Sequence, residues 1–221
     1  MHLECLGRAL QAVILDAGLG GTATDWTVIQ QSLAAERLVC TYDRAGYGWS
    51  NPGPLPRTSG RIADELYMLL HAAGIDGPYV LVGHSFGGYV AELFARRYPE
   101  LTAGLVLVDA SHPEQVARFR APPIGINTAP RARRGLLQYA APPGVPGALP
   151  EGLRAQALAL SATWRARQAL AQEFLQFEAS GAEVLAAGPP PPVPTVVLTR
   201  GRRAWPEGAR GDMSERLWLR L

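Results

Sequence analysis

The stretch Tyr79-Val80-Leu81-Val82-Gly83-His84-Ser85-Phe86-Gly87 joins an apolar run to a segment with helical periodicity. The apolar run predicts a buried strand, and the residues from Ser85 to about Tyr98 predict a helix that Pro99 ends. The pentapeptide has the pattern G-x-S-x-G, in which a serine occupies a sharp and strained strand-to-helix turn between glycines that allow close backbone approach. We therefore interpret Ser85 as a candidate nucleophile.

Strands and helices alternate on both sides of this turn. Further strands are expected at His2 to Leu6, Ala12 to Asp16, Leu38 to Tyr42, Gly104 to Val108 and Thr195 to Thr199. Further helices are expected from about Trp26 to Glu36 and from Ile62 to Ala73. The first two strands have the spacing of a hairpin. The alternation predicts an α/β fold, a mostly parallel sheet with helices on both faces.

The alternation is interrupted after Pro113, and we expect one domain built from three segments. Residues 1–112 form the N-terminal part of the core, 113–194 a helical lid insertion and 195–221 an incomplete C-terminal part of the core. The lid carries a long helical stretch from about Glu151 to Ser180. A last helix is expected to begin near Asp212 with capping-box spacing to Glu215. Because the sequence ends within its pattern, we expect the final strand and helix to be missing.

The composition excludes several classes of protein. With 221 residues, 48% of them hydrophobic, the chain fits a single α/β domain. The net charge is +2 and all 21 basic residues are arginine, without the interleaved aromatic residues of a nucleic-acid site. No apolar stretch reaches the length of about 18 residues that a membrane span needs, so we expect a cytoplasmic protein. Cys5 and Cys40 lie in strand-like runs and are interpreted as small buried hydrophobes, and no metal cluster or cofactor motif is evident.

Three motifs occur in order, and together they resemble the α/β-hydrolase superfamily. Leu15 to Gly21 resembles its oxyanion loop, Tyr42 to Ser50 the motif after the next strand, and Gly83 to Gly88 its nucleophile elbow. The resemblance is strong over residues 2–112 and loose over 195–221, and it points to the esterase-, perhydrolase- and aminopeptidase-like branch with a serine nucleophile. It implies that the backbone N–H groups of Leu19 and Phe86 hold the oxyanion.

The resemblance is less complete for the acid and the base. Asp109 ends the strand before the lid, where part of the superfamily carries its acid, and we favour it over Glu207 and Asp212. The family order is serine, acid, histidine, and the only histidine after Ser85 is His112. The family's base arrives from a loop after the final strand, so His112 is the weaker candidate, and we expect the base to be missing from this chain.

These residues predict a serine hydrolase acting on a small ester, and less so on an amide, through an acyl-enzyme. Substrate contacts are expected from Gly18, His84, Trp164 and Phe174. Asp43 and Arg44 are interpreted as a structural pair. The alternative is a non-catalytic ligand-binding protein or an inactive fragment of the same fold. We expect no nucleic-acid partner, no membrane span, and self-association through the core surface that a truncated domain would leave uncovered.

Overall fold

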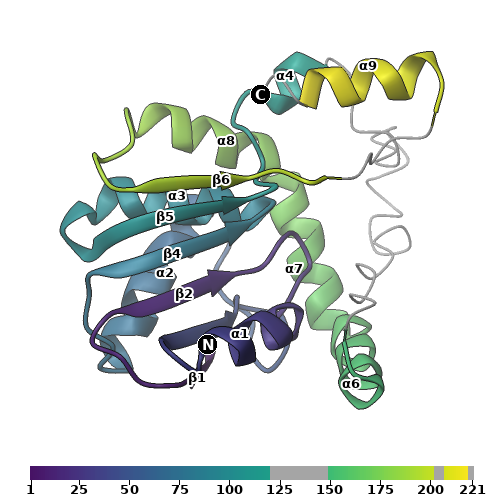
Figure 1. Cartoon of the computed structure of the whole chain (residues 1–221). Helices are drawn as coiled ribbons and strands as arrows, with labels where there is room; N and C mark the ends of the chain where they lie inside the picture. The colour runs from purple at the N-terminus through teal and green to yellow at the C-terminus, as the bar shows by residue number, and fades with distance from the viewer. Residues whose placement is uncertain (120–148, 202–206, 219–221) are drawn as a thin grey trace.

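The computed structural model describes residues 1–119, 149–201 and 207–218 (Figure 1). Within these residues lies a six-stranded sheet in the order β1-β3-β2-β4-β5-β6, with only β1 antiparallel to its neighbour. Its strands are β1 (His2–Leu6), β2 (Ala12–Asp16), β3 (Leu38–Asp43), β4 (Tyr79–His84), β5 (Thr102–Val108) and β6 (Thr195–Leu198). The expected mostly parallel sheet is therefore confirmed.

The expected hairpin of the first two strands is wrong. β1 pairs with β3, which lies between β1 and β2. The reason is burial: β2 is almost entirely buried and pairs with both β3 and β4, whereas β1 is partly exposed along its whole length. A short connection limits the distance between two strands, but an apolar strand takes a central position in the sheet because both its faces must be covered.

The two cysteines form a disulfide, so their interpretation as separate buried hydrophobes is wrong. Cys5 and Cys40 lie directly opposite each other in the antiparallel register of β1 and β3, with Cα atoms 4.1 Å apart. Their pairing follows from the position of β1 at the edge beside β3. That position was not apparent from the sequence, because the hairpin placed β1 beside the wrong strand.

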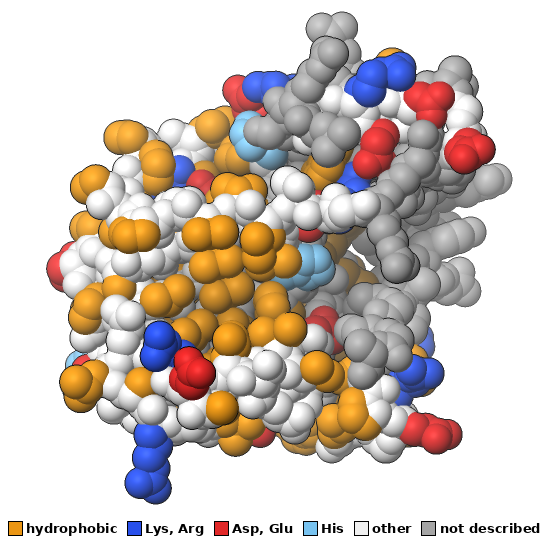
Figure 2. Space-filling view, viewed as in Figure 1, with side chains coloured by type: hydrophobic (Ala, Val, Ile, Leu, Met, Phe, Trp, Pro, Cys, Tyr) orange, Lys and Arg blue, Asp and Glu red, His pale blue; other side chains and the backbone are white. Residues whose placement is uncertain are grey.

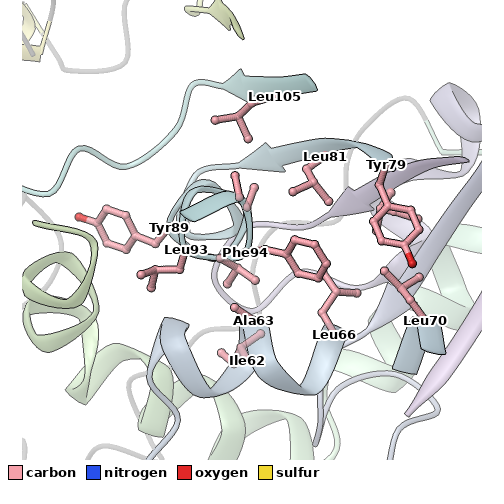
Figure 3. Packing of buried hydrophobic residues seen from close by; sticks show 14 of the residues in the cluster. Ile62, Ala63, Leu66, Leu70, Tyr79, Leu81, Tyr89, Leu93, Phe94 and Leu105 are labelled. Carbon is pink, nitrogen blue, oxygen red and sulfur yellow. The ribbon is translucent and has the colours of Figure 1, made fainter. Parts of the chain in front are cut away.

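Three helices cover one face of the sheet. They are α2 (Ser59–Ala72), α3 (Phe86–Arg97) and α8 (Phe177–Ala186). Figure 3 shows Ile62 and Leu66 of α2 beside Phe94 of α3, with Leu81 of β4 above them. The opposite face carries η1 (Ala23–Trp26) and α1 (Thr27–Leu33), and the Trp26 side chain packs there against a second apolar cluster. Helices therefore lie on both faces, as expected, although the first face is covered far more fully.

The long helix expected from about Glu151 to Ser180 is divided into three. α6 (Glu151–Ser161) is followed by α7 (Trp164–Leu175) and α8. The Thr163 side chain accepts a hydrogen bond from the Ala166 backbone N–H at 3.2 Å and so caps the start of α7. α8 belongs to the body of the domain, because Ser180 Oγ accepts a hydrogen bond from the Ser59 backbone N–H. Residues 120–148 of the expected lid lie outside the described residues.

The remaining described helices are α4 (Gln115–Phe119), η2 (Pro99–Leu101) and α9 (Ala209–Trp218). The capping box expected at Asp212 and Glu215 is wrong, because Asp212 lies inside α9 and its N–H donates to the Gly208 carbonyl. Every described helix is too short or too polar to span a lipid bilayer.

An apolar surface lies on the less covered face of the sheet. Figure 2 shows hydrophobic side chains gathered over the strands in the centre of the view. All four residues of β6 are exposed, and the Val197 side chain is 61% exposed. We name the exposed edge strand β6 the β6 surface; its apolar members are Val197 on one face of the strand and Val196 and Leu198 on the other.

Candidate active site

Ser85 occupies the turn between β4 and α3 in a strained backbone conformation. Its φ is 50° and its ψ is −118°, a region that side chains other than glycine rarely adopt. A Cβ atom on Gly83 would lie 2.4 Å from the Gly87 carbonyl oxygen, and one on Gly87 would lie 2.7 Å from the Asp16 carbonyl oxygen. Both glycines of the pentapeptide are therefore required by close backbone contacts, and the strand-turn-helix expected around Ser85 is present.

The loop after β2 lies against Ser85. A Cβ atom on Gly18 would be 3.2 Å from Ser85 Cβ and 3.0 Å from His84 Nδ1. Among the described residues, neither the Leu19 N–H nor the Phe86 N–H has a backbone or side-chain acceptor. Phe86 directly follows Ser85 in the sequence, and Leu19 follows Gly18 in the loop that lies against Ser85. Neither amide expected to hold an oxyanion is used by another described group.

Arg44 is buried beneath this loop and uses all five of its donors. Its Nη1 donates to Asp16 Oδ1 at 2.7 Å and to the Ala17 carbonyl at 2.6 Å. Its Nη2 donates to the Gly18 carbonyl at 2.7 Å and to Glu173 Oε2 at 3.0 Å. The fifth bond joins Nε to Glu173 Oε1 at 2.9 Å. These bonds connect the end of β2 with helix α7.

Among the described residues, Asp43 and Arg44 do not bind each other. The prediction that they form a structural pair is therefore wrong, because each binds other residues. The Asp43 carboxylate accepts hydrogen bonds from the backbone N–H groups of Ala23 and Trp49. Two tyrosines complete the Arg44 network, since Tyr42 donates to Asp16 and Tyr47 donates to Glu173. Both aspartate and arginine therefore have structural positions, but in separate networks.

The charges of the Arg44 network perturb one another strongly. Desolvation opposes the charged guanidinium, but Glu173 and Asp16 outweigh it and raise the pKa of Arg44 above its usual value. Burial raises the pKa of Asp16, and the nearby Arg44 opposes that rise. Arg44 is therefore permanently charged, and it offsets the cost of burying two carboxyl groups.

Asp109 lies beside Ser85 at the carboxyl end of β5. The Ser85 N–H donates to the Val108 carbonyl at 3.2 Å, and Asp109 itself has a φ of 40°. Its carboxylate accepts hydrogen bonds from Arg200 Nη1 at 3.3 Å and from Trp218 Nε1 at 3.1 Å. The side chain expected to be the acid therefore has the expected place in the sheet, and an arginine and a tryptophan contact it where a histidine was expected.

All four histidines of the chain lie within the described residues, and none makes a hydrogen bond with the Ser85 hydroxyl there. His112 Nδ1 accepts a hydrogen bond from the Glu114 backbone N–H at 3.2 Å, so the remaining nitrogen carries the proton when the ring is neutral. Desolvation also lowers the pKa of His112. His84 is exposed and meets the Trp26 ring edge to face. His2 and His71 lie on β1 and α2, beside Trp49 and Tyr67 respectively.

The structure separates the aromatic residues expected to contact substrate. Trp164 is 61% exposed at the start of α7, whereas Phe174 is half-buried. Phe177 packs against Phe86 and Tyr89 in the domain core. Of the two alternative acids, Glu207 is exposed and Asp212 lies inside α9.

Sequence reasoning missed the functions of two residues near the site. Glu173 is a fully buried carboxylate on α7, and Trp218 binds the candidate acid from α9. Glu173 lies 129 positions from Arg44, so no local pattern relates the two residues. The sequence offered one signal for Glu173: it lies on the same helix face as Ala166 and Ala169, where the other side chains are small and apolar.

Sequence relatives match only part of the chain. A (Lyso)-N-acylphosphatidylethanolamine lipase from Mus musculus is 32% identical over 119 residues, which are 50% of this chain and 34% of the lipase. The protein YqjL from Bacillus subtilis is 34% identical over 103 residues, which are 47% of this chain and 41% of YqjL. The chain therefore matches less than half the length of these relatives.

The fold and the family are shown by longer matches. A thermophilic esterase from Thermogutta terrifontis has a similar structure, with a TM-score of 0.64 and 24% sequence identity, over 98% of this chain and 80% of that chain. A similarity at this level of identity shows the fold alone. The family model described as the alpha/beta hydrolase family matches residues 13–220. The chain belongs to the alpha/beta hydrolase family.

Proposed function

We propose that this hydrolase cleaves a carboxylic ester through an acyl-enzyme on Ser85. The strained turn that holds Ser85 beside the Gly18 loop is the observation that supports this most directly. The Ser85 oxygen attacks the ester carbonyl carbon while a base accepts the hydroxyl proton. The negative charge that develops on the carbonyl oxygen is held by the Leu19 and Phe86 N–H groups. The alcohol then departs with the proton, and water hydrolyses the acyl-enzyme.

The base of this reaction is, in our proposal, a histidine, and in the described structure no histidine makes a hydrogen bond with the Ser85 hydroxyl. Asp109 orients that histidine, and His112 remains a poor substitute because its Nδ1 is already an acceptor. Each of the two Asp109 oxygens accepts one hydrogen bond, from Arg200 or Trp218, and each keeps a second lone pair that a histidine N–H can use. In this proposal the nucleophile and the oxyanion hole are in place, and turnover is limited by proton transfer.

Imidazole in solution tests this proposal by supplying a base. We expect slow hydrolysis of p-nitrophenyl acetate by the native chain and faster hydrolysis when imidazole is added. The matched control is Ser85→Ala, which measures the hydrolysis catalysed by imidazole alone. Equal rates for the native chain and Ser85→Ala at every imidazole concentration would refute the proposed ester hydrolysis.

A non-catalytic ligand-binding protein is the second candidate. The observation that favours it is that the described partners of the Asp109 carboxylate are Arg200 and Trp218, with no histidine among them. A hydrophobic ester analogue that binds without Ser85-dependent turnover or covalent labelling would support this candidate. Asp109→Asn separates the two further, because it would lower imidazole-assisted turnover but leave simple binding in place.

The substrate in this proposal is a small molecule, and no nucleic acid or membrane takes part. The expected cytoplasmic location is opposed by the Cys5–Cys40 disulfide, because structural disulfides persist mainly in oxidising compartments. We also propose that a second copy of the chain associates through the β6 surface, where strand edges and apolar side chains are exposed.

A further inference from the structure

We propose that Arg44 is a positioning residue for the oxyanion hole and that Glu173 of α7 fixes Arg44 in place. This inference rests on the proposed function of Ser85, because it assigns the group that orients the Leu19 amide. α7 lies at the carboxyl end of the sheet, where β2 and β4 end (Figure 1).

The first step concerns the peptide between Gly18 and Leu19. The cis peptide bonds of the described residues precede Pro56 and Pro78, so the Gly18–Leu19 bond is trans. In a trans peptide the carbonyl and the following N–H point in opposite directions. Arg44 Nη2 holds the Gly18 carbonyl at 2.7 Å, so the Leu19 N–H is directed away from Arg44. The hydrogen bond from Arg44 Nη1 to the Ala17 carbonyl orients the Ala17–Gly18 peptide in the same way.

The second step concerns the other oxyanion donor. The Arg44 guanidinium lies 5.5 Å from the centre of the Phe86 ring, within the range of a cation–π contact. The Phe86 side chain is fully buried. One guanidinium therefore contacts the Gly18 carbonyl, which belongs to the same peptide as the Leu19 amide, and the Phe86 ring, so it links the loop after β2 to the start of α3.

The third step concerns Glu173. Its two oxygens take Nε and Nη2 of Arg44 in a bidentate pair, and Tyr47 donates to Oε2 at 2.9 Å. Glu173 is 0% exposed, so the pair is shielded from water and salt. A lysine cannot reproduce this arrangement, because it has three donors on one nitrogen and no planar fork. The fork is what allows one side chain to hold two carboxylates and two carbonyls together.

The chain contains a matched control for a buried arginine. Arg57 is 2% exposed and forms a bidentate pair with Glu65, at 2.6 Å and 2.9 Å. It makes no hydrogen bond to the residues from Asp16 to Leu19 in the described structure. Arg57→Lys therefore disrupts a buried ion pair without altering the oxyanion loop. Arg44→Lys disrupts a buried ion pair and also removes the hydrogen bonds that anchor the oxyanion loop.

The test measures covalent labelling of Ser85, with imidazole present as the base, by a fluorophosphonate whose phosphoryl oxygen enters the oxyanion hole. We expect Arg44→Lys to lower the maximal labelling rate about 10- to 100-fold, less than the loss of a whole donor would, while the half-saturating probe concentration stays within about twofold. Arg57→Lys should keep the native labelling rate once the folded fraction is matched. Equal rates for the two variants, or a change in half-saturation alone, would overturn the proposal.

Amide hydrogen exchange separates this inference from the proposed function. Arg44→Lys should increase exchange of the peptide containing Gly18 to Thr22 by about tenfold or more, because the loop loses its anchor, and Arg57→Lys should not. If native Ser85 is never labelled, the proposed function fails, and the exchange comparison still decides whether Arg44 holds the loop. Unchanged exchange in Arg44→Lys would refute the positioning role in either case.

Discussion

Replacement of Ser85 by glycine should stabilise the protein, because Ser85 adopts a backbone conformation that costs energy for any residue with a Cβ atom. A non-glycine residue in such a region costs about 1–3 kcal/mol. Glycine removes this cost but gives the unfolded chain more freedom, which costs about 0.5–1 kcal/mol. The φ of 50° and ψ of −118° thus predict a net gain of about 1 kcal/mol for Ser85→Gly, within a range of about 0–2.5 kcal/mol.

The assay is thermal unfolding followed by calorimetry. For a chain of this size a gain of 1 kcal/mol corresponds to about 2–4 °C, so Ser85→Gly should melt about 2–4 °C above the native protein. Ser85→Ala is the matched control, since it also removes the hydroxyl but keeps the Cβ atom and therefore the strain. A Ser85→Gly melting temperature at or below that of Ser85→Ala would show that the turn stores no strain.

Four further predictions concern stability and association. Gly83→Ala should lower the free energy of unfolding in urea, by about 3 kcal/mol or more, because its Cβ would lie 2.4 Å from backbone; a loss below 1 kcal/mol would contradict the close contact. Burial raises the pKa of Asp25 from 3.8 to about 6, so its stabilising contribution is complete below pH 4 and is lost as the pH rises through 6. The stability of the native protein relative to Asp25→Asn should therefore fall across that interval, and parallel pH profiles would refute the shift. Reduction of the Cys5–Cys40 disulfide, which closes a loop of 35 residues, should cost about 4 kcal/mol in urea unfolding and have no effect on a Cys5→Ser/Cys40→Ser variant. Val197→Lys should convert associated chains to monomers in analytical ultracentrifugation, and an unchanged distribution would exclude the β6 surface.

The local parts of the fold were predictable from the sequence. β4, Ser85 and α3 follow from one continuous pattern of apolar run, small residues and helical periodicity. The order of the parallel strands also agrees with the alternation of strands and helices. Such features depend on neighbours in sequence, for which periodicity and turn residues are direct signals.

The features that were missed depend on residues far apart in the chain. The hairpin failed because strand spacing does not determine which strand needs burial on both faces. The disulfide followed from the register of β1 and β3, and the Arg44 network followed from the docking of α7. A buried arginine must find acceptors, but the sequence gives no measure of which carboxylates the fold brings to it.

We propose that the fold makes Ser85 a nucleophile, and peptide mapping after fluorophosphonate treatment in the presence of imidazole is a direct test of this role. The native chain should then carry one adduct, located on Ser85 by mass spectrometry, and the same chain unfolded in urea with imidazole present should carry none. This difference is expected because the turn and the amides beside it exist only in the folded protein. A folded, unlabelled native chain, or equal labelling of the folded and unfolded chains, would contradict the account.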